Sequence, residues 1–337
     1  MMSGEPPKPE EWVKSVFEIT DKDFTSLSLR IFNYQYKYNE LYRQFCDLVH
    51  IFPESVTDLT KIPFLPVSFF KTVEVKTGSF SPEVVFESSG TTATKNSKHF
   101  VRDLSIYHKS YLSAFRMFYG DPKEYCILAL LPSYLEREHS SLIYMVNGLM
   151  KYSGHPLNGF YLDDHDRLAD TLNKLENDGQ KTLLIGVTYA LVDFAANNHI
   201  PLKYTVVLET GGMKGRKKEM LRTQVHQILK EAFELPKIHS EYGMTELLSQ
   251  AYSKGDGLFH CPPWMRICIR EEDDPMSVHI NVNSITTGVV NVIDLANINS
   301  CSFIATDDLG KLYPDKGFEI LGRVDNSDIR GCSLLTV

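Results

Sequence analysis

Residues 182–208 read TLLIGVTYALVDFAANNHIPLKYTVVL, and this stretch decides the fold class. The apolar run Thr182–Val187 predicts a buried strand, and Tyr204–Leu208 predicts another. Between them we expect a helix that reaches Asn197, with Thr188 as its N-cap because a hydroxyl oxygen there accepts a backbone N–H bond. The alternation of strand, helix and strand predicts an α/β fold.

The same alternation extends to both sides of this stretch. Regular apolar spacing predicts one long helix over Phe24–Val49, closed by Pro53. Val84–Phe86 and His99–Val101 are expected to pair as a hairpin. From Trp264 onward, short strands replace the helices, so the chain is α/β first and mostly β afterwards. Further elements are expected at Leu104–Tyr119 (helix), Tyr125–Leu131 (strand), Ser140–Lys151 (helix), Asp164–Asn177 (helix), Lys214–Phe233 (helix) and Lys237–His239 (strand).

Composition is typical of a large globular chain. The 337 residues are 43% hydrophobic and 23% charged, which suffices for one large core or two smaller ones. The net charge of −8, without a basic stripe, disfavours a nucleic-acid partner. No stretch reaches the roughly 18 apolar residues that span a bilayer, and the first residues lack the pattern of a secretory signal. We therefore expect a cytoplasmic protein without a transmembrane segment.

The six cysteines form no CxxC pair. Neither a structural zinc site nor disulfides are expected in a reducing compartment. Cys126 and Cys268 lie in apolar stretches and are expected in the core, whereas Cys332 lies in a polar stretch near the end.

A hydroxyl-rich loop, ESSGTTATKNS over residues 87–97, directly follows the first hairpin strand. Gly90 lets the backbone bend and turn its N–H groups toward an anion, and Lys95 adds positive charge. The stretch is not a Walker loop, and a hairpin turn without a ligand is the competing interpretation. The hydroxyls able to donate to phosphate oxygens are those of Ser88, Ser89, Thr91 and Thr92.

A second motif, LETGGM over residues 208–213, follows a strand and precedes a helix. Gly211 and Gly212 would let a flat ligand approach the backbone at the carboxyl end of the strand, where α/β sheets bind ligands. A tight turn without a ligand is the alternative.

A third motif, EYGMTE over residues 241–246, concentrates several functional groups. Tyr242 offers an aromatic plane for a base, Gly243 a bend and Thr245 a hydroxyl. The carboxylate of Glu246 suits Mg²⁺, which binds one or two carboxylates plus phosphate oxygens. The alternative is a helix N-terminus with Glu246 exposed.

The fourth motif pairs TDDLG, residues 306–310, with GRVD, residues 322–325. Asp308 can accept both hydroxyls of a ribose, and Arg323 can hold a ribose or phosphate oxygen. Two β-turns with solvated charges are the alternative. Together the four motifs supply a phosphate loop, a base pocket, a metal carboxylate and a ribose carboxylate, which indicates a nucleotide site.

In this order the motifs resemble those of the adenylate-forming superfamily, which includes acyl-CoA synthetases, peptide-synthetase adenylation domains and firefly luciferase. SSGTT with Lys95 is similar to the superfamily's phosphate loop. The chain most resembles the acyl-protein synthetase family of bacterial luminescence, from about Pro53 onward, in LPSYLER (131–137), EYGMTELLSQ (241–250) and GRVDNSDIRGCSLL (322–335).

The resemblance implies a catalytic domain over residues 1–321, with mostly parallel sheets, flanking helices and a distorted β-barrel portion. A short tail over 322–337 would stand in place of the superfamily's C-terminal lid, because twelve residues follow Asp325. The lid's catalytic lysine would then be missing. Arg323 is expected to supply that charge, ahead of Lys95 and Arg137.

The resemblance also implies roles for individual residues. ATP and Mg²⁺ are the expected cofactors, and a carboxylic acid, expected to be a fatty acid, is the expected substrate. Glu246 would bind Mg²⁺, Asp308 the ribose, and Thr245 the α-phosphate. Gly211, Gly212 and Tyr242 would border the adenine, and the β- and γ-phosphates would be held by Ser88, Ser89, Gly90, Thr91, Thr92 and Lys95.

Three departures from the superfamily's pattern affect these roles. Ala93 replaces a glycine of the phosphate loop, and Asn96 stands near its Pro-Lys, which leaves the role of Lys95 open. Asp307 replaces the glycine of the ribose motif.

The acyl group is expected to pass to a thiol. Cys332 fits by position the functional cysteine of the acyl-protein synthetases, and its thiolate would attack the mixed anhydride; a small buried residue is the alternative. An acyl reductase or an acyl carrier would accept the group. His139 is a candidate for lining the acyl pocket, although a structural histidine is the more common case, and the candidate walls are Leu142–Met150 and Ile185–Leu191.

Two other functions stay open at this point. One is adenylation of a small aromatic acid with transfer to coenzyme A or a carrier thiol. The other is a nucleotide-binding protein without catalysis.

Overall fold

The computed structural model describes residues 9–88, 95–132, 139–162, 164–211 and 220–324. The helices are α1 (Pro9–Phe17), α2 (Phe24–Tyr38), α3 (Glu40–Leu48), α4 (Phe69–Thr72), α5 (Leu104–Tyr119), α6 (Ser141–Ser153), α7 (His165–Asn177), α8 (Thr188–Asn197) and α9 (Arg222–Phe233), with short 3₁₀ turns at Pro53–Ser55, Leu59–Lys61 and Pro122–Glu124. The strands are β1 (Leu65–Pro66), β2 (Val84–Glu87), β3 (Lys98–Val101), β4 (Cys126–Leu130), β5 (Gly159–Phe160), β6 (Thr182–Val187), β7 (Thr205–Thr210), β8 (His239–Tyr242), β9 (Ala251–Ser253), β10 (Phe259–His260), β11 (Met265–Arg270), β12 (Val278–His279), β13 (Thr286–Asp294), β14 (Phe303–Leu312) and β15 (Phe318–Arg323).

One mixed sheet organises the described part of the chain. Its strands follow the order β12-β11-β13-β14-β15-β10-β9-β8-β7-β6-β4-β5, with β1 beside β14, and β2 pairs with β3 in a separate hairpin. Strands β4 to β8 run parallel, whereas β9 to β15 pair antiparallel. The predicted α/β architecture is confirmed.

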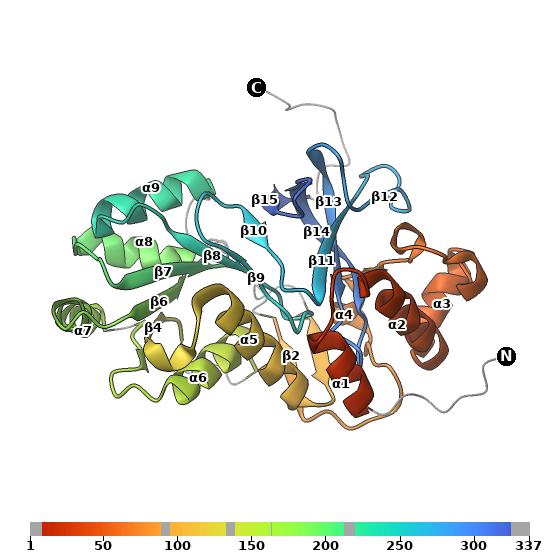
Figure 1. The fold of residues 1–337 in the computed structure, drawn as a ribbon, viewed down its shortest axis with the longest axis horizontal. Helices are drawn as coiled ribbons and strands as arrows, with labels where there is room; N and C mark the ends of the chain where they lie inside the picture. The colour runs from red at the N-terminus through yellow and green to blue at the C-terminus, as the bar shows by residue number, and fades with distance from the viewer. Residues whose placement is uncertain (1–8, 89–94, 133–138, 163, 212–219, 325–337) are drawn as a thin grey trace.

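Buried apolar strands form the core of the parallel half. Every residue of β4 and β6 is buried, as expected for strands covered by helices on both faces. Helices α8 and α9 lie over one face of this half and α5 and α6 over the other (Figure 1). Cys126 on β4 and Cys268 on β11 lie fully in the core, as predicted.

The predicted long N-terminal helix is wrong in one respect, because it is two helices. Asn39 has an extended backbone, and its side chain accepts the backbone N–H of Tyr42. The amide of Asn39 also donates to the carbonyl of Ser300, at 3.0 Å. An asparagine that bonds nearby backbone groups competes with the helix, and the apolar periodicity continues on both sides of the break.

Other predicted boundaries also change, and β8 spans His239–Tyr242 rather than the predicted Lys237–His239. Helix α9 begins at Arg222 rather than at Lys214; residues 212–219 lie outside the described part, and Leu221 before the helix is extended. Val187, not Thr188, is the N-cap of α8, and the Thr188 hydroxyl bonds elsewhere. Among the described helices, none has the length and apolarity to cross a bilayer.

Candidate nucleotide site

The site is built around the carboxyl ends of β7 and β8, which pair in parallel and therefore end at the same edge of the sheet. Gly211 follows β7 with a φ of +72°, a left-handed conformation that favours glycine. The Thr188 hydroxyl contacts both the Glu209 carboxylate and the Gly211 carbonyl oxygen. This contact holds the turn, so Thr188 supports the LETGGM motif rather than capping α8.

Gly243 follows the end of β8 in a crowded position. A Cβ atom at Gly243 would collide with a carboxylate oxygen of Glu241. That carboxylate also accepts a hydrogen bond from the Thr210 hydroxyl on β7. The bend after Tyr242 is therefore tied to the neighbouring parallel strand.

Tyr242 and Asp308 join the two halves of the sheet. The Tyr242 hydroxyl donates to one oxygen of the Asp308 carboxylate at 2.7 Å, and Arg323 Nε donates to the other at 3.2 Å. Burial, followed by the nearby Asp308 carboxylate, raises the pKa of Tyr242 well above its usual range, so the phenol keeps its proton. The structure thus brings together three of the predicted site residues.

This contact requires a strongly curled sheet. Strands β8 and β14 are four positions apart in the sheet order, which would separate them by about 19 Å in a flat sheet. The Tyr242 ring packs against Phe259 of β10 and Phe318 of β15, with ring centroids 6.1 and 5.5 Å away. The short strands β9 and β10 therefore form a corner that turns the antiparallel half back onto β8.

Asp308 and Arg323 lie within strands rather than in the turns that the sequence left open as an alternative. They are direct partners across β14 and β15, and cross-strand neighbours of opposite charge attract each other. The Arg323 side chain is 79% exposed, whereas Asp308 is 9% exposed. Arg323 therefore reaches from a buried carboxylate into solvent.

Glu246 is buried, contrary to the alternative of an exposed residue at a helix N-terminus. Its exposed fraction is 6%, and no helix begins there. Burial raises the pKa of Glu246, while a hydrogen bond with Ser97 and the positive charges of Arg323 and Lys71 lower it. A buried carboxylate is stable only with donors or cations around it, so this position fits a cation.

A complete protein-only metal cage is not present in the described part of the chain, where no three His, Cys, Asp or Glu side chains come together. Mg²⁺ keeps several non-protein ligands and binds proteins through one or two carboxylates plus phosphates. A lone buried carboxylate such as Glu246 fits that mode.

The two ends of the predicted phosphate loop are hydrogen-bonded to each other. Ser97 N donates to Ser88 Oγ at 2.9 Å, and Ser88 N donates to the Ser97 carbonyl at 3.1 Å. Lys95 is exposed beside this closure. The remaining loop residues of the prediction, Ser89, Gly90, Thr91 and Thr92, lie outside the described residues, as do Gly212, Arg137 and Cys332.

His99 is a neighbour of the site that the sequence did not single out. Its Nδ1 lies 2.9 Å from the carbonyl oxygen of Thr245, so Nδ1 carries the proton. Burial lowers the pKa of His99 to about 4, and the ring is neutral at physiological pH. Lys71, whose positive charge lowers the pKa of Glu246, was missed as well, because nothing in its local sequence marks it.

The predicted acyl-pocket residues differ in burial. His139 is exposed, and its carbonyl accepts the backbone N–H of Glu87 at 2.8 Å, beside the phosphate loop. Many residues of the two candidate walls, including Met145, Leu149 and Leu191, are packed in the core.

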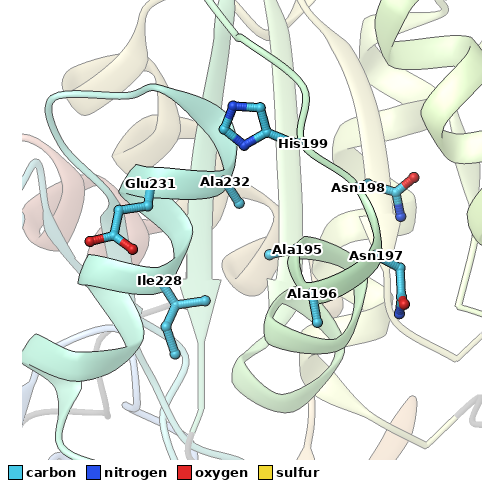
Figure 2. Close-up of a pocket in the computed structure, with 8 residues that line it drawn as sticks. All are labelled: Ala195, Ala196, Asn197, Asn198, His199, Ile228, Glu231 and Ala232. Atoms are coloured by element: carbon cyan, nitrogen blue, oxygen red, sulfur yellow. The ribbon is translucent and has the colours of Figure 1, made fainter.

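A cavity of about 460 Å³ opens elsewhere, between the ends of α8 and α9. Figure 2 shows Asn197 and Asn198 on one side of it and Ile228 and Glu231 on the other. Because α8 starts at the carboxyl ends of the strands, its last residues lie at the opposite edge of the sheet. This cavity is therefore separate from the nucleotide site.

Comparison with solved structures shows that the chain shares its fold with an adenylate-bound CoA ligase and with a luciferase-like enzyme. The crystal structure of 2-hydroxyisobutyryl-CoA ligase in complex with 2-HIB-AMP matches 96% of this chain and 73% of that protein, with a TM-score of 0.64 at 12% identity. The luciferase-like enzyme of the mealworm Zophobas morio matches 76% of this chain and 61% of that protein, with a TM-score of 0.52 at 16% identity.

The chain belongs to the acyl-protein synthetase (LuxE) family, which matches residues 9–336. A named relative, the long-chain-fatty-acid–luciferin-component ligase of Vibrio harveyi, is 26% identical over 350 residues, spanning 97% of this chain and 89% of that protein. The protein is therefore an enzyme of the ligase type, which activates a carboxylic acid with ATP and transfers the acyl group.

Proposed function

We propose that this protein converts a fatty acid and Mg·ATP into a fatty acyl-adenylate and then transfers the acyl group to Cys332. The contact of Tyr242 with Asp308 and Arg323 supports the proposal, because residues predicted to bind the base and the ribose meet there. The name of the Vibrio harveyi relative supports a long-chain fatty acid as substrate.

In the first step, a carboxylate oxygen of the acid attacks the α-phosphorus of ATP, and the bond to the β-phosphate oxygen breaks. Pyrophosphate leaves, and the acyl-adenylate remains. The protein contributes by positioning the reactants and by neutralising charge. The neutral, buried phenol of Tyr242 and the carboxylate of Asp308 would hold the nucleoside, with Gly211, Gly212 and Gly243 leaving room for it.

Charge on the phosphates is the main obstacle to this attack. Mg²⁺ held by Glu246 would offset part of that charge. Ser88, Lys95 and the loop between them would bind the β- and γ-phosphates. Arg323 stays our first choice for the remaining positive charge, since its guanidinium reaches solvent from Asp308. Lys71 is the second choice, because its charge acts on Glu246.

In the second step, the Cys332 thiolate attacks the acyl carbon, and AMP leaves as the thioester forms. An acyl reductase or an acyl carrier then takes the acyl group. We also propose the division into a catalytic domain, residues 1–321, and a tail, residues 322–337, that brings Cys332 to the site. Strand β15 ends at Arg323, which pairs with Asp308 of β14, so the described part of the tail lies beside that carboxylate.

The test uses the full chain with Mg·ATP and a radiolabelled C14 fatty acid, comparing wild type with Cys332→Ser. We expect both proteins to catalyse ATP–pyrophosphate exchange and only the wild type to become acylated. Equal labelling of both proteins would mean that the acylated thiol is not Cys332. ATP–pyrophosphate exchange that occurs only with aromatic acids would mean that the substrate is an aromatic acid and not a fatty acid.

Absence of exchange with every acid would contradict the first step itself. Calorimetric binding of Mg·ATP to the same protein would then favour the alternative of nucleotide binding without catalysis. The cytoplasmic location stays a prediction that fractionation of cells with an antibody to this chain would test.

A further inference from the structure

The segment from Thr245 to Ser249 connects β8 to β9 without belonging to either. Apart from one turn hydrogen bond, from Leu247 N to the Met244 carbonyl, its backbone bonds go to side chains. Buried backbone groups that no helix or strand satisfies need such partners. The identity of these side chains therefore decides where the segment lies.

Ser97 and His99 reach this segment from one face of the hairpin that carries the phosphate loop. Alternate residues of a strand point to the same face, and both are buried. Ser97 hydrogen-bonds the Glu246 carboxylate, and His99 Nδ1 donates to the Thr245 carbonyl at 2.9 Å. Lys98 between them points away, 54% exposed, and pairs with Glu87.

A third contact comes from the loop between β13 and β14. Asn297 Nδ2 donates to the Glu246 carbonyl at 2.7 Å. Asn297 is itself held, since its carbonyl accepts from Gln35 of α2 at 3.0 Å. Consecutive carbonyls, of Thr245 and Glu246, are thus each bonded by a buried side chain.

We propose that His99 is a positioning residue, which fixes the Thr245–Glu246 backbone relative to the hairpin that carries the phosphate loop. The inference rests on the proposed function, because it assigns the contact to the geometry of the nucleotide site. His99 is 1% exposed and touches Phe70 edge-on with ring centroids 5.9 Å apart, so the ring itself is held in place. A displacement of about 1 Å at such a site costs roughly 10²-fold in rate.

The test compares three variants of the full chain. His99→Phe keeps a ring and removes the donor, His99→Asn retains an amide N–H near the position of Nδ1, and Lys98→Gln alters the opposite face of the same strand. The readouts are hydrogen exchange of the peptide 243–250 without ligand, calorimetric affinity for Mg·ATP, and the kcat and KM of ATP–pyrophosphate exchange.

For His99→Phe we expect faster hydrogen exchange in peptide 243–250, weaker Mg·ATP binding and a loss of about 10- to 100-fold in kcat/KM for ATP. The KM for the fatty acid should stay within about twofold, because a positioning defect at the phosphates leaves acid binding intact. His99→Asn should recover part of each loss, and Lys98→Gln should match the wild type.

Unchanged exchange of peptide 243–250 in His99→Phe overturns the inference, and so does faster exchange with unaltered Mg·ATP affinity and kinetics. If His99→Phe does not fold, the comparison of His99→Asn with Lys98→Gln in the same three measurements tests the inference. A wild type without pyrophosphate exchange contradicts the proposed function alone, since hydrogen exchange and Mg·ATP affinity still test the role of His99.

Discussion

The two halves of the sheet present their site residues in different ways. The parallel half does so in loops, with Gly211 after β7 and Glu246 after β8. The antiparallel half does so from paired strands, where Asp308 and Arg323 face each other across β14 and β15. Loop residues depend on side chains that anchor the loop, whereas strand residues depend on register, so the two halves should respond differently to substitution.

The largest effect is expected at the loop carboxylate. Glu246→Gln should lower kcat/KM for pyrophosphate exchange by about 10²-fold or more, as for the loss of one preorganised charged group. Because burial raises the pKa of Glu246, the variant should unfold at an equal or higher urea concentration than the wild type. A parallel loss of stability would mean that Glu246 is a structural residue.

The next effect concerns the anchor of the same segment. The Asp294 carboxylate accepts from the backbone N–H groups of Leu248, Ser249 and Ala296, at 2.8 to 3.1 Å. Asp294→Ala should lower the free energy of unfolding by about 3 kcal/mol, since these three backbone donors and the Ser249 hydroxyl, which donates to the same carboxylate at 2.6 Å, lose their partner. Urea unfolding followed by circular dichroism would measure it.

A loss below about 1 kcal/mol in Asp294→Ala would mean that water or a rearranged loop replaces the carboxylate. Asp274→Ala is the control. The Asp274 carboxylate lies in an exposed turn, where it accepts the backbone N–H of Met276 at 3.0 Å.

The antiparallel half should show a smaller, binding-specific effect. Asp308→Ala is expected to raise the KM for ATP about tenfold, because a ribose would lose a charged hydrogen-bond acceptor. Asp307→Ala is the matched control, since this neighbour in β14 alternates to the other side of the strand. Equal effects of the two variants in the exchange assay would contradict the assignment of the ribose to Asp308.

The smallest effect is the contribution of His239, in the parallel half, to the pH dependence of stability. Burial and the positive charges of Lys254 and Lys237 lower the pKa of His239 to about 4. The unfolded chain binds this proton near pH 6.5, whereas the folded chain does so only near pH 4. Stability is therefore fully present above pH 6.5 and is lost as the pH falls through this window.

His239→Asn should flatten this slope by about 1 kcal/mol between pH 7 and 4.5, a modest value because part of the ring reaches solvent. Urea midpoints at several pH values would measure the slope. His260→Asn, at an exposed position of β10, should leave it unchanged; equal slopes for all three proteins would contradict the prediction.

Local chemistry made much of the fold predictable. Leu104–Tyr119 and Thr182–Val187 were predicted with both boundaries correct, since Gly120 ends the helix and a continuous apolar run defines the strand. Thr188 and Asn39 were misjudged, because their side chains bond partners that are distant in sequence, Glu209 and Ser300. Propensity carries no information about such partners.

The sequence by itself determined the α/β class, the adenylate-forming motifs and the residue types of a nucleotide site, because these depend on local pattern and chemistry. Only the tertiary structure decided that β9 and β10 turn the sheet so that Tyr242 meets Asp308, at 2.7 Å. The structure also brought His99 to Thr245, a contact between residues 146 positions apart. Strand register and sheet curl act over such separations, and no local pattern records them.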